Sequence, residues 1–225
     1  MNDTVSATPK KMSVKTIAVI GVLTAVTCIL APLSIPIGDV PISLTNLVIY
    51  FGLYILGTRR ETVSYIVYLL IGLVGVPVFS GFTAGPAKMF GPTGGYLIGF
   101  IPMAVIAGIF IEKSGRKLVL GMIGMILGTA VCYIFGTVWF VLVMKTSVQA
   151  ALTMCVYPFI VFDIIKMVLA AWIGPQIHGR LVQAGLLLRE SMCTSMVHIF
   201  SIPTIKRCGI TLQNLRNLTA LRIHR

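Results

Sequence analysis

Charged side chains are scarce in this sequence. Together they account for 11% of the 225 residues, and only six residues are Asp or Glu, whereas 57% of the residues are hydrophobic. The mean hydropathy of the chain is +0.98. An ordinary soluble domain has about 25% charged residues. This deficit excludes a soluble globular domain and indicates a polytopic membrane protein.

The sequence also lacks the motifs of metal and nucleotide chemistry. The five cysteines form no CxxC pair, and none of the three histidines has a carboxylate or a cysteine at ligand spacing, so we expect neither a metal site nor a cofactor. We interpret the cysteines as small buried hydrophobes or incidental thiols. A phosphate loop of the form GxxxxGKS or GxxxxGKT is absent too, so any ATP hydrolysis must belong to partner chains.

Long apolar runs recur along the chain. A helix that spans a bilayer needs about 20 apolar residues, and this rule predicts an all-α membrane protein with six transmembrane helices in a bundle. We expect these helices at residues 14–31, 43–57, 62–79, 91–111, 118–143 and 158–178. The stretch 144–157 is mixed in character, and we expect a short loop helix there.

A proline-rich loop, residues 34–41, precedes the second of these runs. Repeated prolines and a glycine cannot continue a helix. Because the run 43–57 is brief for a span, this loop is a candidate for backbone that enters the protein. Irregular backbone is tolerated at membrane depth only where protein or a cavity covers it.

Lysine and arginine give the chain a net charge of +12, but they stand in short clusters beside the apolar runs. This arrangement is typical of membrane topology rather than of nucleic-acid binding. Only Lys88 and Lys145 fall on one side of the expected topology, so the positive-inside rule predicts that both termini are cytoplasmic. The cations on the cytoplasmic side are Lys10, Lys11, Lys15, Arg59, Arg60, Lys113, Arg116, Lys117 and Arg180.

These patterns divide the chain into three parts. We expect a cytoplasmic N-terminal tail at residues 1–13, a membrane substrate-binding domain at 14–182 and a basic C-terminal extension at 183–225. In the extension, leucines recur at three-residue intervals from Leu212 to Leu221 among arginines. A basic amphipathic helix on the membrane surface has this pattern. A disordered extension has it as well, and we favour that interpretation.

The last apolar run carries one acid and one base. Asp163 and Lys166 are three residues apart, so on a helix they lie on the same face within side-chain reach. Each ionisable group costs about 2.5 to 3.5 kcal/mol at the centre of a membrane helix. One interpretation is a self-neutralising pair that holds this helix to a neighbour. We favour a polar substrate site, because ionisable residues within spans face a bundle interior or cavity.

Small residues recur at every fourth position in two of the runs. One ridge consists of Gly91, Gly95 and Gly99, and a second runs from Gly124 to Gly136. Such ridges let helices approach closely, and we interpret both as packing surfaces within the protein.

Four separated motifs together resemble those of the BioY family. They are VPISLTN at residues 40–46, GVPVF at 75–79, GPTGGYLIGF at 91–100 and PFIVFDIIK at 158–166. Members of this family are the biotin-binding membrane components, or S components, of energy-coupling-factor (ECF) transporters. The resemblance covers roughly residues 14–182 and implies a six-helix bundle in the cell membrane that binds biotin from the outside.

The resemblance also implies partners and functional residues. Family members work with a coupling transmembrane subunit and two cytoplasmic ATPases. They use an Asp and a Lys three residues apart in the last helix for the ligand, which here are Asp163 and Lys166. The first-span surface that docks on the coupling subunit corresponds to Ala18, Gly21 and Ala25, which match the usual alanine pattern loosely.

Two positions depart from the family pattern. Thr45 stands where a glutamine is more usual, which alters a polar contact, and Phe162 stands where a glycine is usual. We expect Phe162 to add bulk beside Asp163.

The chemistry of biotin suits the residues of these motifs. Its ureido ring offers two N–H donors and one carbonyl acceptor, and its valerate chain ends in a carboxylate. We expect Asp163 to accept from the ureido N–H groups and Lys166 to donate to the carbonyl or to Asp163. For the carboxylate, the candidates are Lys88 and Thr93, together with the helix N-terminus that follows Thr93.

Four further residues complete the predicted site. Thr45 and Asn46 offer polar contacts, while Tyr96 and Phe79 wall the rings, as in mostly apolar pockets. Simpler roles compete for three candidates: a solvated Lys88, a helix cap at Thr93 and an interfacial belt position for Tyr96.

Three other functions compete with this one. An intramembrane enzyme would need a second polar catalytic group beside Asp163, and no histidine or paired acid accompanies it. A stand-alone, proton-coupled carrier is compatible with an Asp–Lys relay, but the inverted repeats that would favour it are not evident. An S component for another vitamin stays open, although the GPTGGY and DxxK motifs together favour biotin.

Overall fold

The computed structural model describes residues 14–35 and 41–184. These residues belong to one compact unit, Met1–Leu188. The predictions about the N-terminal tail and the C-terminal extension concern residues outside this described part.

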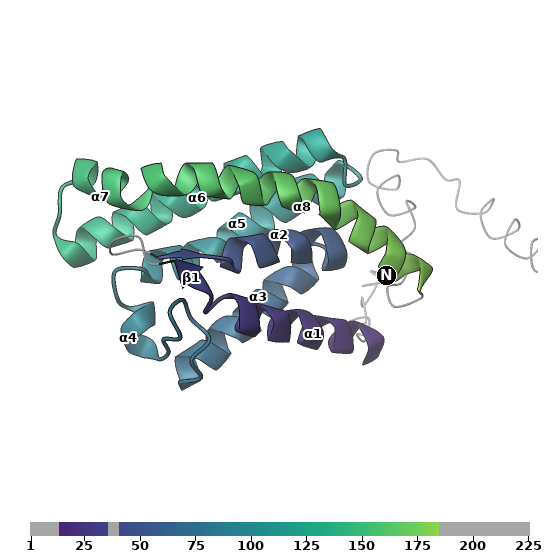
Figure 1. The fold of residues 1–225 in the computed structure, drawn as a ribbon, viewed down its shortest axis with the longest axis horizontal. Helices are drawn as coiled ribbons and strands as arrows, with labels where there is room; N and C mark the ends of the chain where they lie inside the picture. Colours follow the sequence, from purple (N-terminus) through teal and green to yellow (C-terminus); the bar gives the residue numbers. More distant parts are fainter. Residues whose placement is uncertain (1–13, 36–40, 185–225) are drawn as a thin grey trace, which may run out of the picture. The chain divides into compact units, whose positions relative to one another are not determined.

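The described residues are almost entirely helical (Figure 1). The six longer helices are α1 (Val14–Leu30), α2 (Thr45–Leu56), α3 (Thr58–Val74), α5 (Gly94–Lys113), α6 (Leu118–Met144) and α8 (Tyr157–Gln183). Two shorter helices, α4 (Pro86–Met89) and α7 (Val148–Cys155), lie between them, and α7 is the loop helix expected in 144–157. Two short strands, β1 (Ser34–Ile35) and β2 (Ile42–Ser43), pair antiparallel within the proline-rich region.

Three helices, α5, α6 and α8, are long and apolar enough to cross a membrane by length and composition. The helices α1 and α2 are apolar but shorter. On α6 and α8, large apolar side chains face outward, among them Ile134, Val138 and Trp172. Apolar surface of this extent is typical of a protein that contacts lipid. The fold is therefore that of a helical membrane protein, while the count of six spans stays a prediction.

The boundaries predicted for 62–79 are wrong at both ends. The helix α3 begins earlier because Gly57, at φ +81°, separates it from α2, and the Glu112 carboxylate accepts a hydrogen bond from the Thr58 N–H at 2.7 Å. It ends at Val74 because Gly75 adopts the left-handed conformation at φ +116°. At the last helix, the predicted end at 178 is too early, since α8 continues to Gln183 with Pro175 inside it.

The short second run forms the most enclosed helix. α2 contacts α1, α3, α5 and α8, and its buried side chains point in every direction around its axis. A helix that is apolar all round is typically buried. Figure 1 shows α8 alongside α6, with α7 between them at one end. These contacts bring the start of α2 against the N-terminal part of α8.

The small-residue ridges pack α5 against α6, as predicted. Gly95 and Gly99 of α5 lie against Trp139 and Cys132 of α6, while Gly136 of α6 lies against the ring of Tyr96. Because each of these glycines faces a neighbouring helix with no room for a side chain, the two backbones can approach closely.

We expect Gly128→Ala to lower the stability of the protein by about 1–2 kcal/mol. A Cβ added at Gly128 would lie 2.8 Å from the carbonyl oxygen of Met103, so α5 and α6 would have to move apart. Thermal unfolding in detergent measures the effect. The matched control is Gly21→Ala on α1, where nothing lies within 4 Å of the added Cβ. Equal melting temperatures for both variants would show that the small-residue ridges are not needed to pack α5 against α6.

Candidate functional site

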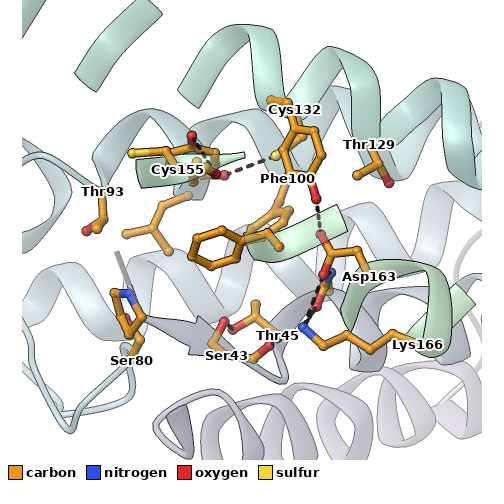
Figure 2. Close-up of a pocket in the computed structure, with 16 residues that line it drawn as sticks. Ser43, Thr45, Ser80, Thr93, Phe100, Thr129, Cys132, Cys155, Asp163 and Lys166 are labelled. Atoms are coloured by element: carbon orange, nitrogen blue, oxygen red, sulfur yellow. Dashed lines mark hydrogen bonds and ion pairs between the residues drawn. The ribbon is translucent and has the colours of Figure 1, made fainter. Parts of the chain in front are cut away.

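A cavity lies between the N-terminal part of α8 and the N-terminal end of α5 (Figure 2). Helices α2, α5, α6, α7 and α8 all contribute to its walls, together with loop residues near β2 and α4. The lining residues are Pro41, Ser43, Thr45, Asn46, Ser80, Thr93, Tyr96, Leu97, Phe100, Thr129, Cys132, Tyr133, Cys155, Phe159, Asp163 and Lys166.

Asp163 lies at one end of this cavity, on the buried face of α8, and is 5% exposed. Its oxygen Oδ1 accepts a hydrogen bond from Asn46 Nδ2 at 2.7 Å, and Oδ2 accepts one from the Tyr133 hydroxyl at 2.6 Å. A buried carboxylate is stable only when such partners replace its water. Helices α2, α6 and α8 therefore meet at this one side chain.

Lys166 lies one helical turn further on, 7% exposed. Its ammonium nitrogen donates to the Ser43 carbonyl at 2.7 Å, to Asn46 Oδ1 at 3.0 Å and to Asp163 Oδ1 at 3.2 Å. An ammonium has three protons to donate, so these acceptors use all of them. The predicted ion pair is thus present, and every proton of the ammonium group has an acceptor.

The local sequence explains how α2 and β2 reach the pair. The strand β2 ends the proline-rich region and leaves the Ser43 carbonyl free to accept from Lys166. Asn46 lies in the first turn of α2, and its Oδ1 also accepts from the Leu47 N–H at 3.1 Å, which fixes the amide orientation. Pro41 and Ser43 both line the cavity. Of the predicted loop, Pro41 therefore reaches the cavity, while Ser43 belongs to the run that follows it.

A second contact joins α2 to α6 beneath the cavity. The hydroxyl of Thr129 donates to the Met125 carbonyl at 2.7 Å, so the Tyr50 hydroxyl is the donor in its 2.5 Å contact with Thr129. Tyr50 is fully buried. This bond holds the two helices that supply Asn46 and Tyr133 to the carboxylate.

The other end of the cavity carries no such network. Leu97, Phe100 and Phe159 form apolar walls of the cavity. Tyr96, which also lines it, donates a long hydrogen bond of 3.4 Å to the Cys155 carbonyl. The hydroxyl of Thr93 is buried and has no hydrogen-bond partner within residues 14–35 and 41–184. Figure 2 shows Thr93 and Ser80 on the opposite side of the view from Asp163 and Lys166.

Six of the residues predicted for the site line the cavity. They are Asp163, Lys166, Thr45, Asn46, Tyr96 and Thr93. Thr45 receives a hydrogen bond from the Ser43 hydroxyl at 3.0 Å. Thr93 precedes α5 but makes no side-chain cap bond, so the simpler role of a helix cap does not apply.

Phe79 and Lys88 do not line the cavity, which corrects their predicted placement. The early end of α3 makes the chain fold back, and the ring of Phe79 packs on Gly72 and against Tyr68, with ring centres 5.7 Å apart. Lys88 lies half-buried on α4, where burial lowers the pKa of its ammonium group. Neither position follows from chain order alone, because both depend on the turn after Gly75.

Several lining residues were not predicted. Tyr133 is the most consequential, because it donates directly to Asp163. A buried hydroxyl within an apolar helix needs a hydrogen-bond partner. Tyr133 follows Cys132, which belongs to the small-residue ridge of α6, and this position was the signal in the sequence that could have identified it. Ser43 contributes a backbone carbonyl, for which the sequence carries no signal.

The arrangement suits recognition rather than catalysis. Its polar end offers one carboxylate, one ammonium and one amide, all held in fixed positions by hydrogen bonds. Such a set can bind a small polar ring that has both donors and acceptors. Among the described residues, no three His, Cys, Asp or Glu side chains are grouped to hold a metal ion.

Comparison with known proteins assigns the chain to a family. A model described as BioY family matches residues 4–183. The chain belongs to the BioY family. Its C-terminal extension lies beyond the matched region.

Individual relatives agree with this assignment. The biotin transporter BioY of Thermotoga maritima is 36% identical over 155 residues, which cover 68% of this chain and 90% of the relative. The probable biotin transporter BioY of Pyrococcus horikoshii is 34% identical over 168 residues, which cover 75% and 99%. A crystal structure of the S-component for biotin from an ECF-type ABC transporter matches at a TM-score of 0.69 and 29% identity, over 75% of this chain and 95% of that one. BioY proteins are thus named as transport proteins, not as enzymes.

Two features that the BioY resemblance singled out can now be placed. Ala18, Gly21 and Ala25 are exposed on α1, whose opposite side is buried at Ile20 and Thr24. Phe162 is 42% exposed and does not line the cavity. Its bulk therefore lies outside the site, which corrects the expected crowding of Asp163.

Proposed function

We propose that this chain is the biotin-binding S component of an ECF-type transporter and that biotin binds in the cavity beside Asp163. The observation that carries the proposal is the buried network of Asp163, Lys166, Asn46 and Tyr133 at one end of an otherwise mostly apolar cavity, in a member of the BioY family. Pockets for small molecules typically combine apolar walls with a few placed polar groups.

The hydrogen-bond capacity of the network favours a ligand that donates. A carboxylate has about four acceptor sites, and Asp163 accepts three bonds, only one of them at Oδ2. A ureido N–H can therefore add to Asp163 without displacing a protein partner. Lys166 has no spare proton, so a ureido carbonyl would take the place of one of its acceptors.

The membrane arrangement that we propose has six spans, with both termini in the cytoplasm and the chain in the plasma membrane. Exposed cations support it: Arg59, Lys113 and Lys117 lie at the α2–α3 and α5–α6 turns, while Lys145 lies at the far end of α6 from Lys117. The excess of cations at one end indicates the cytoplasmic side. Biotin then reaches the cavity from the outside.

Transport requires partners in this proposal. The chain contains no phosphate loop, so two ATPase subunits and a coupling membrane subunit supply the energy. The exposed small-residue face of α1, formed by Ala18, Gly21 and Ala25, is the docking surface that we propose for the coupling subunit. Small side chains there allow another helix to approach closely.

We expect Ala25→Trp to reduce assembly with the coupling subunit at least about tenfold, because a bulky side chain on a close-packed helix face blocks approach. Co-purification with the partner complex measures assembly, and biotin binding by the isolated variant shows that it is folded. The matched control is Ala130→Trp, an equally small and exposed position on α6. Equal assembly by both variants would remove α1 from the interface.

The purified chain alone is expected to bind labelled biotin and to hydrolyse no ATP. Unlabelled biotin should displace the label, whereas thiamine and riboflavin should not, since neither carries a ureido ring. Equilibrium binding in detergent or nanodiscs measures this. A folded sample that fails to bind biotin, or that prefers another vitamin, would refute the proposed substrate.

A further inference from the structure

The two ends of the cavity differ sharply in charge. Of the described residues that line it, Asp163 and Lys166 alone are charged, and both belong to the network at one end. The opposite end is lined by Ser80, Thr93 and Cys155. A ligand that places a polar ring on Asp163 therefore extends its tail toward neutral groups.

Thr93 is the polar group at this second end that still needs a partner. It is 8% exposed, and among the described residues its Oγ1 has no hydrogen-bond partner. A buried hydroxyl without a hydrogen-bond partner carries an unfavourable desolvation free energy. A ligand atom that makes a hydrogen bond to Thr93 removes this penalty. Thr93 occupies the N-cap position of α5 but makes no side-chain cap bond, so its hydroxyl can turn toward a ligand.

A hydroxyl does not select for charge. It can donate a hydrogen bond and also accept one, so it can pair with a carboxylate, a carboxamide or an ester. A lysine would pair best with an anion, but Lys88, the cation that the sequence offered for this role, lies outside the lining. A carboxylate buried without a cation loses more hydration than a neutral amide does. The neutral form therefore meets no disadvantage at this end.

We infer that the cavity is selective for the ureido end of its ligand and tolerant at the tail end, so that it binds biotin derivatives with a neutral, hydrogen-bonding tail. In this inference the Thr93 hydroxyl makes a hydrogen bond to that tail. The substrate class is then biotin together with its carboxamides. The inference rests on the proposed function, since it assumes that the ureido ring lies at Asp163.

Displacement of labelled biotin from the purified full-length protein tests the inference. Biotin primary amide is expected to bind within about tenfold of biotin, because a hydrogen bond from a hydroxyl to an ionised carboxylate and one to a neutral amide differ in strength by about that much. A biotin methylated on a ureido nitrogen is expected to fail. A loss of more than about tenfold for the amide, with biotin itself binding, would overturn the inference and leave the proposed function intact. Absence of biotin binding would instead refute the proposed function.

Substitution of Thr93 tests the residue itself. Thr93→Val keeps the shape and removes the hydroxyl, and it should weaken biotin and biotin amide alike, by up to about tenfold. The matched control is Thr58→Val, at a threonine whose hydroxyl is likewise buried and without a partner among the described residues but which lies outside the cavity lining. It should leave both affinities unchanged. If Thr93→Val behaves like Thr58→Val, Thr93 does not receive the tail.

Discussion

Lys166→Met is expected to destabilise the unliganded protein by about 3–5 kcal/mol, because it leaves the buried carboxylate of Asp163 without its cation. Asp163→Asn should also destabilise it, since the Lys166 ammonium then loses its counter-ion while staying buried. The double variant removes both charges and should recover most of the stability. Biotin affinity should behave differently and stay low in all three variants, with Asp163→Asn alone costing about 1.5–3 kcal/mol of binding.

The contrast between stability and affinity separates a structural ion pair from a binding site. Thermal unfolding without ligand and equilibrium biotin binding are compared for both single variants and the double. Lys145→Met is the matched control, because Lys145 is exposed at the end of α6 and its loss should change neither quantity. A double variant that recovered stability and bound biotin normally would remove Asp163 and Lys166 from the site.

Asn46→Leu is the second substitution with a large expected effect. The Asn46 amide donates to Asp163 and accepts from Lys166, so leucine removes one partner from each buried charge. Two hydrogen bonds to charged groups together contribute about 3–6 kcal/mol. We expect a loss of stability in that range and a fall in biotin affinity of at least about tenfold, because the amide holds both charged groups in position.

Tyr50→Phe is a suitable comparison for Asn46→Leu. Tyr50 lies one turn further along α2, is fully buried and makes a neutral hydrogen bond to Thr129. Its loss should cost only about 1 kcal/mol. Unfolding in detergent and biotin titration are measured on both variants. A loss for Asn46→Leu no larger than that for Tyr50→Phe would show that the amide does not support the charged pair.

The main features of the fold follow from local properties of the sequence. The positions of the six long helices could be predicted from the apolar runs. A helix makes all its backbone hydrogen bonds internally, so in lipid it needs only a continuous apolar stretch. The glycine ridges predicted packing surfaces on α5 and α6 for a similar reason, because the spacing of small residues alone shapes the helix surface; that the two surfaces face each other came from the structure. The errors lie at helix ends, where Gly75 and the Glu112 contact with Thr58 decide the boundary.

The candidate site was predictable where its residues share one helix. Asp163 and Lys166 pair at i,i+3 spacing, and the high cost of charge in a membrane helix distinguished them. Tyr133 and the Ser43 carbonyl were missed because their partners lie far away in the chain. Phe79 and Lys88 were misplaced because the turn that follows α3 carries them away from the cavity.

The sequence by itself therefore determined a helical membrane protein with one buried charge pair, and its motifs placed that pair in the BioY family. These properties depend on composition, periodicity and short spacings, which act within a single helix. Only the tertiary structure decided which residues surround the pair: Asn46 and Ser43 reach it where α2 packs on α8, and Tyr133 reaches it from α6, which also contacts α8. It also decided that Thr93, and not Lys88, lines the far end, since long-range packing alone brings that end together.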